Sequence, residues 1–204
     1  MTNEYKFTER WFDDQIPAWE QAFKAYDRCI FRVLEIGCYE GRATTWLCEN
    51  ILDEAIYDVV DTFEGSLNEA GMIQAVSLLA EDKNYLEKTF KHNISFFEDR
   101  IDFHIYKGYS QQVLPQLYTL GNKYDFIYID ASHKADDTFV DAYWAHKMLN
   151  NGGLLIFDDW GWKDPRDLSP NNSPEMGIRQ FMTLYSQDYK MLFHGYQIGL
   201  IKND

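Results

Sequence analysis

The sequence predicts a doubly wound α/β fold, in which a mostly parallel sheet of seven strands carries helices on both faces. Short apolar runs rich in β-branched residues alternate with helical periodicity five times between residues 30 and 160. Those five runs end in a glycine or an acid, as strands at the binding edge of such sheets often do. Two further apolar runs around Gly195 predict an antiparallel hairpin at the C-terminal edge.

The elements follow in order along the chain. We expect strands at 33–36, 56–62, 101–107, 124–130, 154–157, 189–194 and 197–202. We expect helices after Pro17, at 43–52, across 66–98, after Ser110, around 139–149 and at 177–185. The stretch 66–98 is longer than one crossover helix requires, so it predicts either two helices or a local lid.

Length and composition predict a single domain over residues 1–204. Apolar residues make up 46% and aromatic residues 17% of the 204, which excludes a disordered chain. Within the domain, residues 1–28 predict an N-terminal helical cap, and the Pro-, Asn- and Trp-rich stretch 160–176 predicts a substrate loop. Trp11 and Phe12 precede the first helix and either cover the core or overhang a ligand cleft.

A net charge of −14 disfavours nucleic acid and anionic membranes as partners. The chain has neither an apolar run of 18 residues nor a signal-peptide core at its start, so we expect a soluble, cytoplasmic protein. Its three cysteines, an odd number without metal or redox spacing, are expected to be reduced. The sequence leaves the formation of a homo-oligomer open.

The segment LEIGCYEG, residues 34–41, predicts a buried strand, a glycine turn and the start of a helix. Gly37 and Gly41 permit a tight reversal and close approach of a ligand to the backbone. The dinucleotide fingerprint lacks its middle glycine here, and Glu40 would repel a pyrophosphate. Glu35 suits a ligand with a cationic amino group. The alternative is an ordinary turn between a strand and a helix.

Two further strand ends contribute to the predicted ligand site. Asp61 closes the second strand, where an acid typically accepts the hydroxyls of a ribose. Glu64 is a rival for that role, and Asp61 could alternatively cap a helix. The turn Gly108-Tyr109-Ser110 follows the third strand at the same edge as Gly37.

Three acids follow the fourth and fifth strands, which are expected to be neighbours. Asp130, Asp158 and Asp159 could therefore converge and hold Mg²⁺ or a similar hard cation. Without a cation these carboxylates would repel one another. The alternative is that Asp130 alone orients a substrate while Asp158 and Asp159 form a solvated turn.

The motifs together carry a family resemblance that covers most of residues 30–160. LEIGCYEG resembles the first motif of class I S-adenosylmethionine (SAM) dependent methyltransferases, with their Rossmann-like fold. GYSQQVLPQL, YDFIYIDASH and NGGLLIFDDW resemble, in order and spacing, catechol-type, caffeoyl-CoA-type and antibiotic-sugar O-methyltransferases. The resemblance implies a metal at Asp130, Asp158 and Asp159 and adenine contacts at Ser110 and Gln111. The expected cofactor-binding residues are Glu35, Gly37, Cys38, Tyr39, Gly41, Asp61, Thr62, Gly108, Tyr109, Ser110, Gln111 and Asp130.

The chain also departs from the catechol type. His133 stands where the catechol type has lysine; some sugar-methylating relatives also have histidine at this position. Asp159 stands where the catechol type has asparagine. We expect His133 to act with Asp130 in catalysis as the base that accepts the acceptor's proton; alternatively it caps a helix or orders Asp130. His146 lies on an apolar stripe and is expected to be packed.

These features predict a SAM-dependent, metal-assisted O-methyltransferase that acts on a small hydroxylated molecule, such as a sugar, a catechol-like compound or another natural product. Two alternatives remain open at this point. One is a nicotinamide-dependent oxidoreductase, and the other is a catalytically silent SAM-binding domain.

Overall fold

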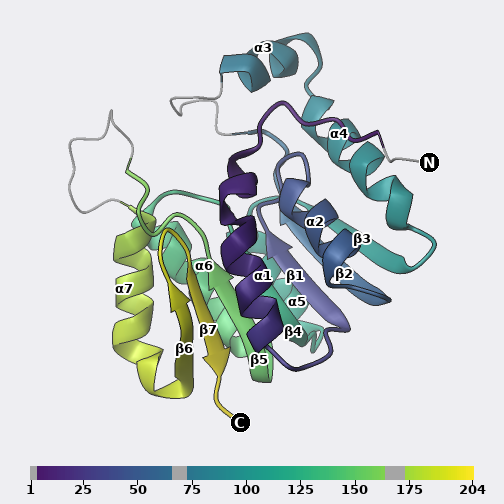
Figure 1. Ribbon diagram of the computed structural model, residues 1–204. Coiled ribbons are helices and arrows are strands. Elements are labelled where there is room, and N and C mark those ends of the chain that lie inside the picture. Colours follow the sequence, from purple (N-terminus) through teal and green to yellow (C-terminus); the bar gives the residue numbers. More distant parts are fainter. Residues whose placement is uncertain (1–3, 66–72, 164–172) are drawn as a thin grey trace.

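The computed structural model describes residues 4–65, 73–163 and 173–204, and within them seven strands form one sheet (Figure 1). The strand order is β3-β2-β1-β4-β5-β7-β6. The strands are β1 (Arg32–Ile36), β2 (Ala55–Asp61), β3 (Ile101–Lys107), β4 (Tyr124–Ile129), β5 (Leu149–Phe157), β6 (Tyr189–His194) and β7 (Ile198–Lys202). The first five pair in parallel, whereas β7 pairs antiparallel with both β5 and β6. The predicted sheet with its antiparallel C-terminal edge is confirmed.

Helices cover both faces of this sheet (Figure 1). The α-helices are α1 (Ile16–Ala25), α2 (Arg42–Asn50), α3 (Ile73–Glu81), α4 (Tyr85–Ile94), α5 (Ser110–Thr119), α6 (Ala135–Met148) and α7 (Pro174–Tyr185). Short 3-10 turns are η1 (Trp11–Gln15), η2 (Ser95–Phe97) and η3 (Ser186–Asp188). None of the helices in the described ranges is long and apolar enough to cross a membrane.

Alternation along the strands builds two cores, one on each face. In β1, Val33 faces the core formed with α1, α2 and α4, whereas Leu34 and Ile36 face the core formed with α5, α6 and α7. Trp19 of α1 is fully buried in the first core and contacts Tyr128 of β4, with ring centroids 4.9 Å apart. The predicted N-terminal helix therefore packs directly on the sheet.

Strand β1 lies between β2 and β4, and this position brings several strand ends together. The Gly37 N–H donates to the Val60 carbonyl at 2.8 Å, and the Asp130 N–H donates to the Ile36 carbonyl at 2.8 Å. The Gly108 N–H likewise donates to the Asp61 carbonyl at 2.9 Å. The turns that follow β1, β3 and β4 therefore share the carboxyl edge of the sheet.

Several predicted boundaries were wrong. β5 begins at Leu149 instead of residue 154. The polar residues 150–153 belong to this strand, at the point where the register between β4 and β5 shifts. α7 begins at Pro174 instead of residue 177, since proline is favoured in the first turn of a helix. The predicted substrate loop therefore ends in a helix, and its residues 164–172 lie outside the described ranges.

The sequence left alternatives open for the stretch 66–98 and for Trp11 and Phe12, and the structure describes most of these residues. The stretch 66–98 contains two helices, α3 and α4, while residues 66–72 lie outside the described ranges. Phe12 joins the core at 8% exposure, whereas Trp11 is 54% exposed and lies beside Tyr39, with ring centroids 5.7 Å apart. The two neighbouring aromatic residues therefore have different environments.

We predict that Gly37→Ala destabilises the fold far more than Gly121→Ala. Both glycines have a positive φ, which costs alanine about 1 to 2 kcal/mol. A Cβ at Gly121 meets nothing within 4 Å, whereas a Cβ at Gly37 would lie 2.0 Å from the Asp130 carbonyl oxygen. We expect a loss of about 4 kcal/mol or more for Gly37→Ala, measured by urea unfolding. Equal losses in both variants would contradict the close contact.

Candidate functional site

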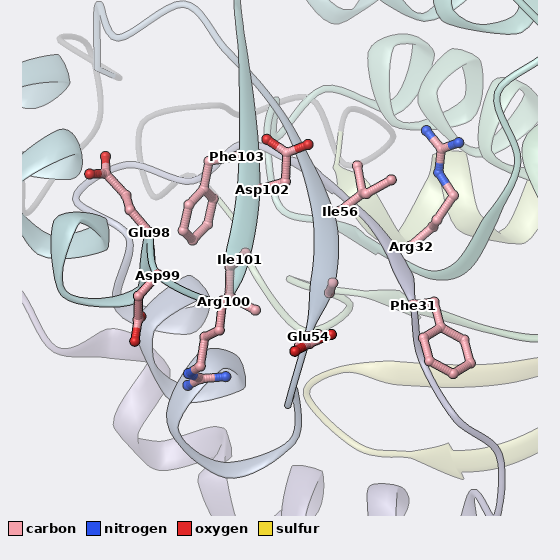
Figure 2. A pocket seen from close by; sticks show the side chains of 11 residues that line it. Phe31, Arg32, Glu54, Ile56, Glu98, Asp99, Arg100, Ile101, Asp102 and Phe103 are labelled. Atoms are coloured by element: carbon pink, nitrogen blue, oxygen red, sulfur yellow. The ribbon is translucent and has the colours of Figure 1, made fainter.

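A hollow of about 720 Å³ lies at the edge of the sheet opposite the glycine turn (Figure 2). It is lined by Ala55 and Ile101, the first residues of β2 and β3, so it faces the amino ends of the strands. The guanidinium of Arg100 donates to the backbone carbonyls of Leu52 and Cys48 at the end of α2. Arg100 therefore has a structural role. The hollow lies at the opposite edge from the site that the motifs predict.

At the carboxyl edge, the carboxylate of Asp61 holds the glycine turn in place. Its Oδ2 accepts the backbone N–H groups of Cys38 at 2.7 Å and Tyr39 at 3.0 Å, and its Oδ1 accepts the Phe63 N–H at 2.6 Å. Tyr39 and Phe63 both have a positive φ, near 51° and 54°, which is uncommon for aromatic residues. Asp61 therefore stabilises a strained double turn at the ends of β1 and β2.

Glu35 lies beneath this turn and is only 1% exposed. Its Oε2 accepts the hydroxyl of Thr44 at 2.5 Å and that of Tyr57 at 2.9 Å. Burial raises the pKa of Glu35 to about 7, although these two hydrogen bonds act in the opposite direction. The structure thus places Glu35 in the core below the predicted cofactor position, with donors from the protein itself.

The turn after β3 lies next to the end of β2. The Tyr109 hydroxyl donates to Glu64 at 3.1 Å, which joins the turn to the segment that follows Thr62. Ser110 begins α5 and is 9% exposed, and Gln111 donates its side-chain amide to Asp137 of α6 at 2.8 Å. Gly108, Tyr109, Ser110 and Gln111 therefore share the edge occupied by Gly37 and Asp61.

The acids after β4 and β5 are linked by Tyr128. Its hydroxyl contacts the carboxylates of both Asp130, at 3.2 Å, and Asp158. Asp158 Oδ2 also accepts the side-chain amide of Gln197 at 2.9 Å, and Gln197 in turn accepts the Trp19 indole N–H at 2.6 Å. The N-terminal helix, the fourth strand and the closing hairpin thus meet behind Asp158.

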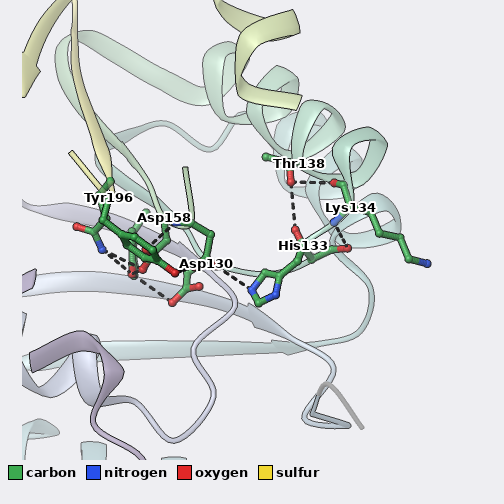
Figure 3. A network of polar contacts seen from close by, with 10 residues as sticks. Asp130, His133, Lys134, Thr138, Asp158 and Tyr196 are labelled. Atoms are coloured by element: carbon green, nitrogen blue, oxygen red, sulfur yellow. Dashed lines mark hydrogen bonds and ion pairs between the residues drawn. The ribbon is translucent and has the colours of Figure 1, made fainter. Parts of the chain in front are cut away.

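Asp159 contacts His133, and Figure 3 shows the polar network in which His133, Asp158 and Tyr196 lie. His133 Nε2 lies 2.7 Å from Asp159 Oδ2, and the Tyr196 hydroxyl donates to Asp159 Oδ1 at 2.7 Å. The ring of Trp162 lies 4.2 Å from that of His133. His133 precedes α6 in a turn that Thr138 anchors by donating to the Ser132 carbonyl at 3.1 Å. The imidazole is therefore held from two sides.

One ligand atom each from Asp130, His133 and Asp159 lies within 4.8 Å of the others, a spacing that could hold a metal ion. Asp158, which the sequence places in the metal set, instead accepts hydrogen bonds from the protein. Burial and the neighbouring carboxylates raise the pKa of Asp130 well above its ordinary value. Burial, followed by the charge of Asp159, raises the pKa of Asp158 to about 6. The carboxylates oppose one another's ionisation because like charges repel.

Sequence reasoning missed four residues of this cluster: Trp19, Tyr128, Tyr196 and Gln197. The sequence around each of these residues indicates only a buried position or a turn. No local signal could have identified them as members of this cluster. Asp159 also has a positive φ of 59°, which could not be predicted from the sequence. Such strain in a non-glycine residue is often found at functional sites.

A family model described as a methyltransferase domain matches residues 34–160, more than half of the 204 residues. The chain belongs to this methyltransferase-domain family. The match spans β1 to the end of β5, including the glycine turn and the three acids. The predicted methyltransferase class is confirmed, and the family disfavours the alternative of a nicotinamide enzyme.

Among curated proteins, the chain is similar to uncharacterized protein R132 of Acanthamoeba polyphaga mimivirus. The two are 28% identical over 142 residues, which are 69% of this chain and 57% of that relative. The chain therefore spans little more than half the length of the curated relative.

The chain also shares its fold with solved structures. One is the O-methyltransferase from Bacillus cereus in complex with SAH, with 19% identity, a TM-score of 0.57, and coverage of 92% of this chain and 78% of that one. Another is MycE methyltransferase from the mycinamycin biosynthetic pathway, in complex with Mg, SAH and mycinamycin VI. It has 15% identity and a TM-score of 0.57, and the match covers 97% of this chain and 51% of that one.

We predict that Glu35→Gln stabilises the protein at high pH but not at low pH. The raised pKa of Glu35, about 7 against 4.5, means that its contribution to stability falls as pH rises between these values. Glutamine remains neutral, so the variant should gain up to about 3 kcal/mol relative to the parent between pH 4.5 and pH 8. Urea unfolding at both pH values measures this gain. Exposed Glu20→Gln is the matched control, and a gain at pH 8 no larger than at pH 4.5 would refute the assignment.

Proposed function

We propose that the chain is a SAM-dependent O-methyltransferase that acts on a small hydroxylated molecule with the help of a divalent cation. The observation that carries this proposal is the shared edge: the glycine turn, Asp61 and the acid cluster all follow strand carboxyl ends there. The relatives crystallised with SAH, one of them also with Mg and a natural product, support the same combination. A catalytically silent SAM-binding domain is the alternative that the activity test addresses.

The cofactor is proposed to lie along the turns after β1, β2 and β3. Gly37, Cys38, Tyr39 and Gly41 would line its methionine part, and Glu35 would favour its ammonium group from below. Asp61 or its rival Glu64 would accept the ribose hydroxyls, next to Thr62. The adenine would lie at Gly108, Tyr109, Ser110 and Gln111, with Asp130 at the centre of the edge. The support for this placement is that these turns adjoin one another through backbone hydrogen bonds.

The residues present fit a hard cation. Asp130 and Asp159 supply carboxylate oxygens close together, and their mutual repulsion would be relieved by a positive ion. In the structure the third residue close to Asp130 and Asp159 is His133. We propose Asp158 as the third ligand instead, because Mg²⁺ prefers oxygen ligands. When bound, such a cation would acidify an acceptor hydroxyl and fix its direction.

His133 is proposed to take the acceptor's proton. Its Nε2 contacts the Asp159 carboxylate, which would stabilise the imidazolium that results, and Trp162 limits the movement of its ring. Thr138 and the start of α6 fix the turn that carries it. These contacts keep the imidazole beside the acids, where an acceptor hydroxyl would be bound.

We predict that a chelator abolishes methyl transfer and leaves SAM binding intact. Radiolabelled SAM is incubated with a panel of catechols, sugars and nucleotide sugars, with and without excess EDTA, and calorimetry measures SAM binding in parallel. Loss of transfer with restoration by Mg²⁺ is expected, because the cation is proposed to act on the acceptor alone. Full activity in EDTA would refute the metal, and SAM binding without transfer to any acceptor would favour the silent domain.

We predict that His133→Ala lowers turnover by about 100-fold or more, the usual size of a general-base contribution. The dissociation constants for SAM and Mg²⁺, measured by calorimetry, should stay within about twofold of the parent if His133 is the base. A large loss of Mg²⁺ affinity would instead assign His133 to the metal. His92→Ala changes a half-buried histidine of α4 that contacts the Glu4 carbonyl; this variant is the control and should retain parental turnover.

A further inference from the structure

Two acids on α6, Asp137 and Asp141, lie one helical turn apart and face the first residues of α5. Asp137 accepts the side-chain amide of Gln111 at 2.8 Å and the Ser132 hydroxyl at 2.7 Å. Asp141 is 0% exposed, and among the described residues neither of its oxygens has a hydrogen bond of normal geometry. The polar group that faces it is the hydroxyl of Ser110, the first residue of α5.

An ionised carboxylate can only accept hydrogen bonds, so it determines which way its neighbours point their hydrogens. Gln111 must present its amide NH₂ to Asp137, which leaves its Oε1 directed elsewhere. Ser110 has a single hydroxyl hydrogen, and the charge of an ionised Asp141, which this hydroxyl faces, directs the hydrogen toward the acid. Ser110 Oγ then offers a ligand its lone pairs alone. The two acids thereby give two adjacent residues of α5 the character of hydrogen-bond acceptors.

We propose that Asp137 and Asp141 are positioning residues that make Ser110 and Gln111 selective for the exocyclic amino group of an aminopurine. This inference rests on the proposed function, which places the adenine of SAM at these two residues. The 6-amino group of adenine is a donor and matches two acceptors. The 6-oxo group of hypoxanthine is an acceptor and would face lone pairs, leaving buried polar atoms unpaired.

The state of Asp141 supports this arrangement and adds a second readout. Burial raises the pKa of Asp141 to about 7; the Ser110 hydroxyl lowers it and the charge of Asp137 raises it. Among the described residues, Asp137 is the charged group that acts on it. Asp141 is therefore mainly ionised at pH 8 and mainly protonated at pH 6. Protonated, it can donate to Ser110 Oγ and release the serine hydrogen toward the ligand.

The test compares two ligands of the full chain by calorimetry: S-adenosylhomocysteine and its 6-oxo analogue, S-inosylhomocysteine. At pH 8 the parent should bind the adenosyl compound at least tenfold more tightly. Asp141→Asn, whose amide donates to Ser110, should lower this preference about tenfold, and lowering the pH to 6 should lower it in the parent. Asp136→Asn removes the same charge from an exposed neighbour on α6 and should leave the preference unchanged.

Ser110→Ala is the second variant if Asp141→Asn does not fold, because it removes a single uncharged hydroxyl and leaves both acids of α6 in place. It should weaken binding of the adenosyl compound about tenfold and leave that of the inosyl compound nearly unchanged. A preference that persists in Ser110→Ala, or in a folded Asp141→Asn, overturns the inference while the cofactor assignment stands. Failure of the parent to bind either compound would refute the proposed function itself.

Discussion

The close contact between Gly37 and the backbone of Asp130 is the constraint on which the rest of the edge depends. A side chain at Gly37 would collide with the Asp130 carbonyl, so only glycine lets β1 end directly beside β4. The glycine turn and the first acid of the cluster are thereby held in register by the central strand pair. A cofactor bound on the turn and a cation bound by the acid would be neighbours, as a methyl transfer from the cofactor to an acceptor oriented by the cation would require.

A second constraint is the supply of donors to buried acids in a chain with a net charge of −14. Tyrosine hydroxyls supply many of them: Tyr57 donates to Glu35, Tyr124 to Asp58, Tyr128 to Asp158 and Tyr196 to Asp159. A phenol satisfies a carboxylate without neutralising its charge. These four tyrosines therefore supply donors to buried acids without adding positive charge.

The sequence predicted well which residues lie at the carboxyl edge of the sheet, because the end of a strand can be recognised from the local sequence. Gly37, Asp61, Asp130 and Asp158 each follow an apolar run, and the parallel sheet brings such ends to one edge. It could not predict the partners of Asp158. Gln197 is 39 residues away in the closing hairpin, and Trp19 contacts Gln197 across 178 residues. Such partners depend on tertiary packing, in which any buried polar side chain of suitable reach can serve.

The same limit explains why the sequence did not reveal the protein groups that two of the acids contact. Asp61 was expected to accept a ribose, but its oxygens also hold the N–H groups of Cys38 and Tyr39, and only the folded double turn reveals this. Asp158 and Asp159 are adjacent in sequence, yet the left-handed φ of Asp159 turns its carboxylate toward His133 while Asp158 stays with Tyr128. Under the proposed function this division has a consequence. SAM carries a positive sulfonium and its product does not, so each carboxylate of this edge that is ionised favours binding of the substrate over binding of the product. Neutral donors behind Asp158 preserve that bias, whereas a buried lysine or arginine in their place would abolish it.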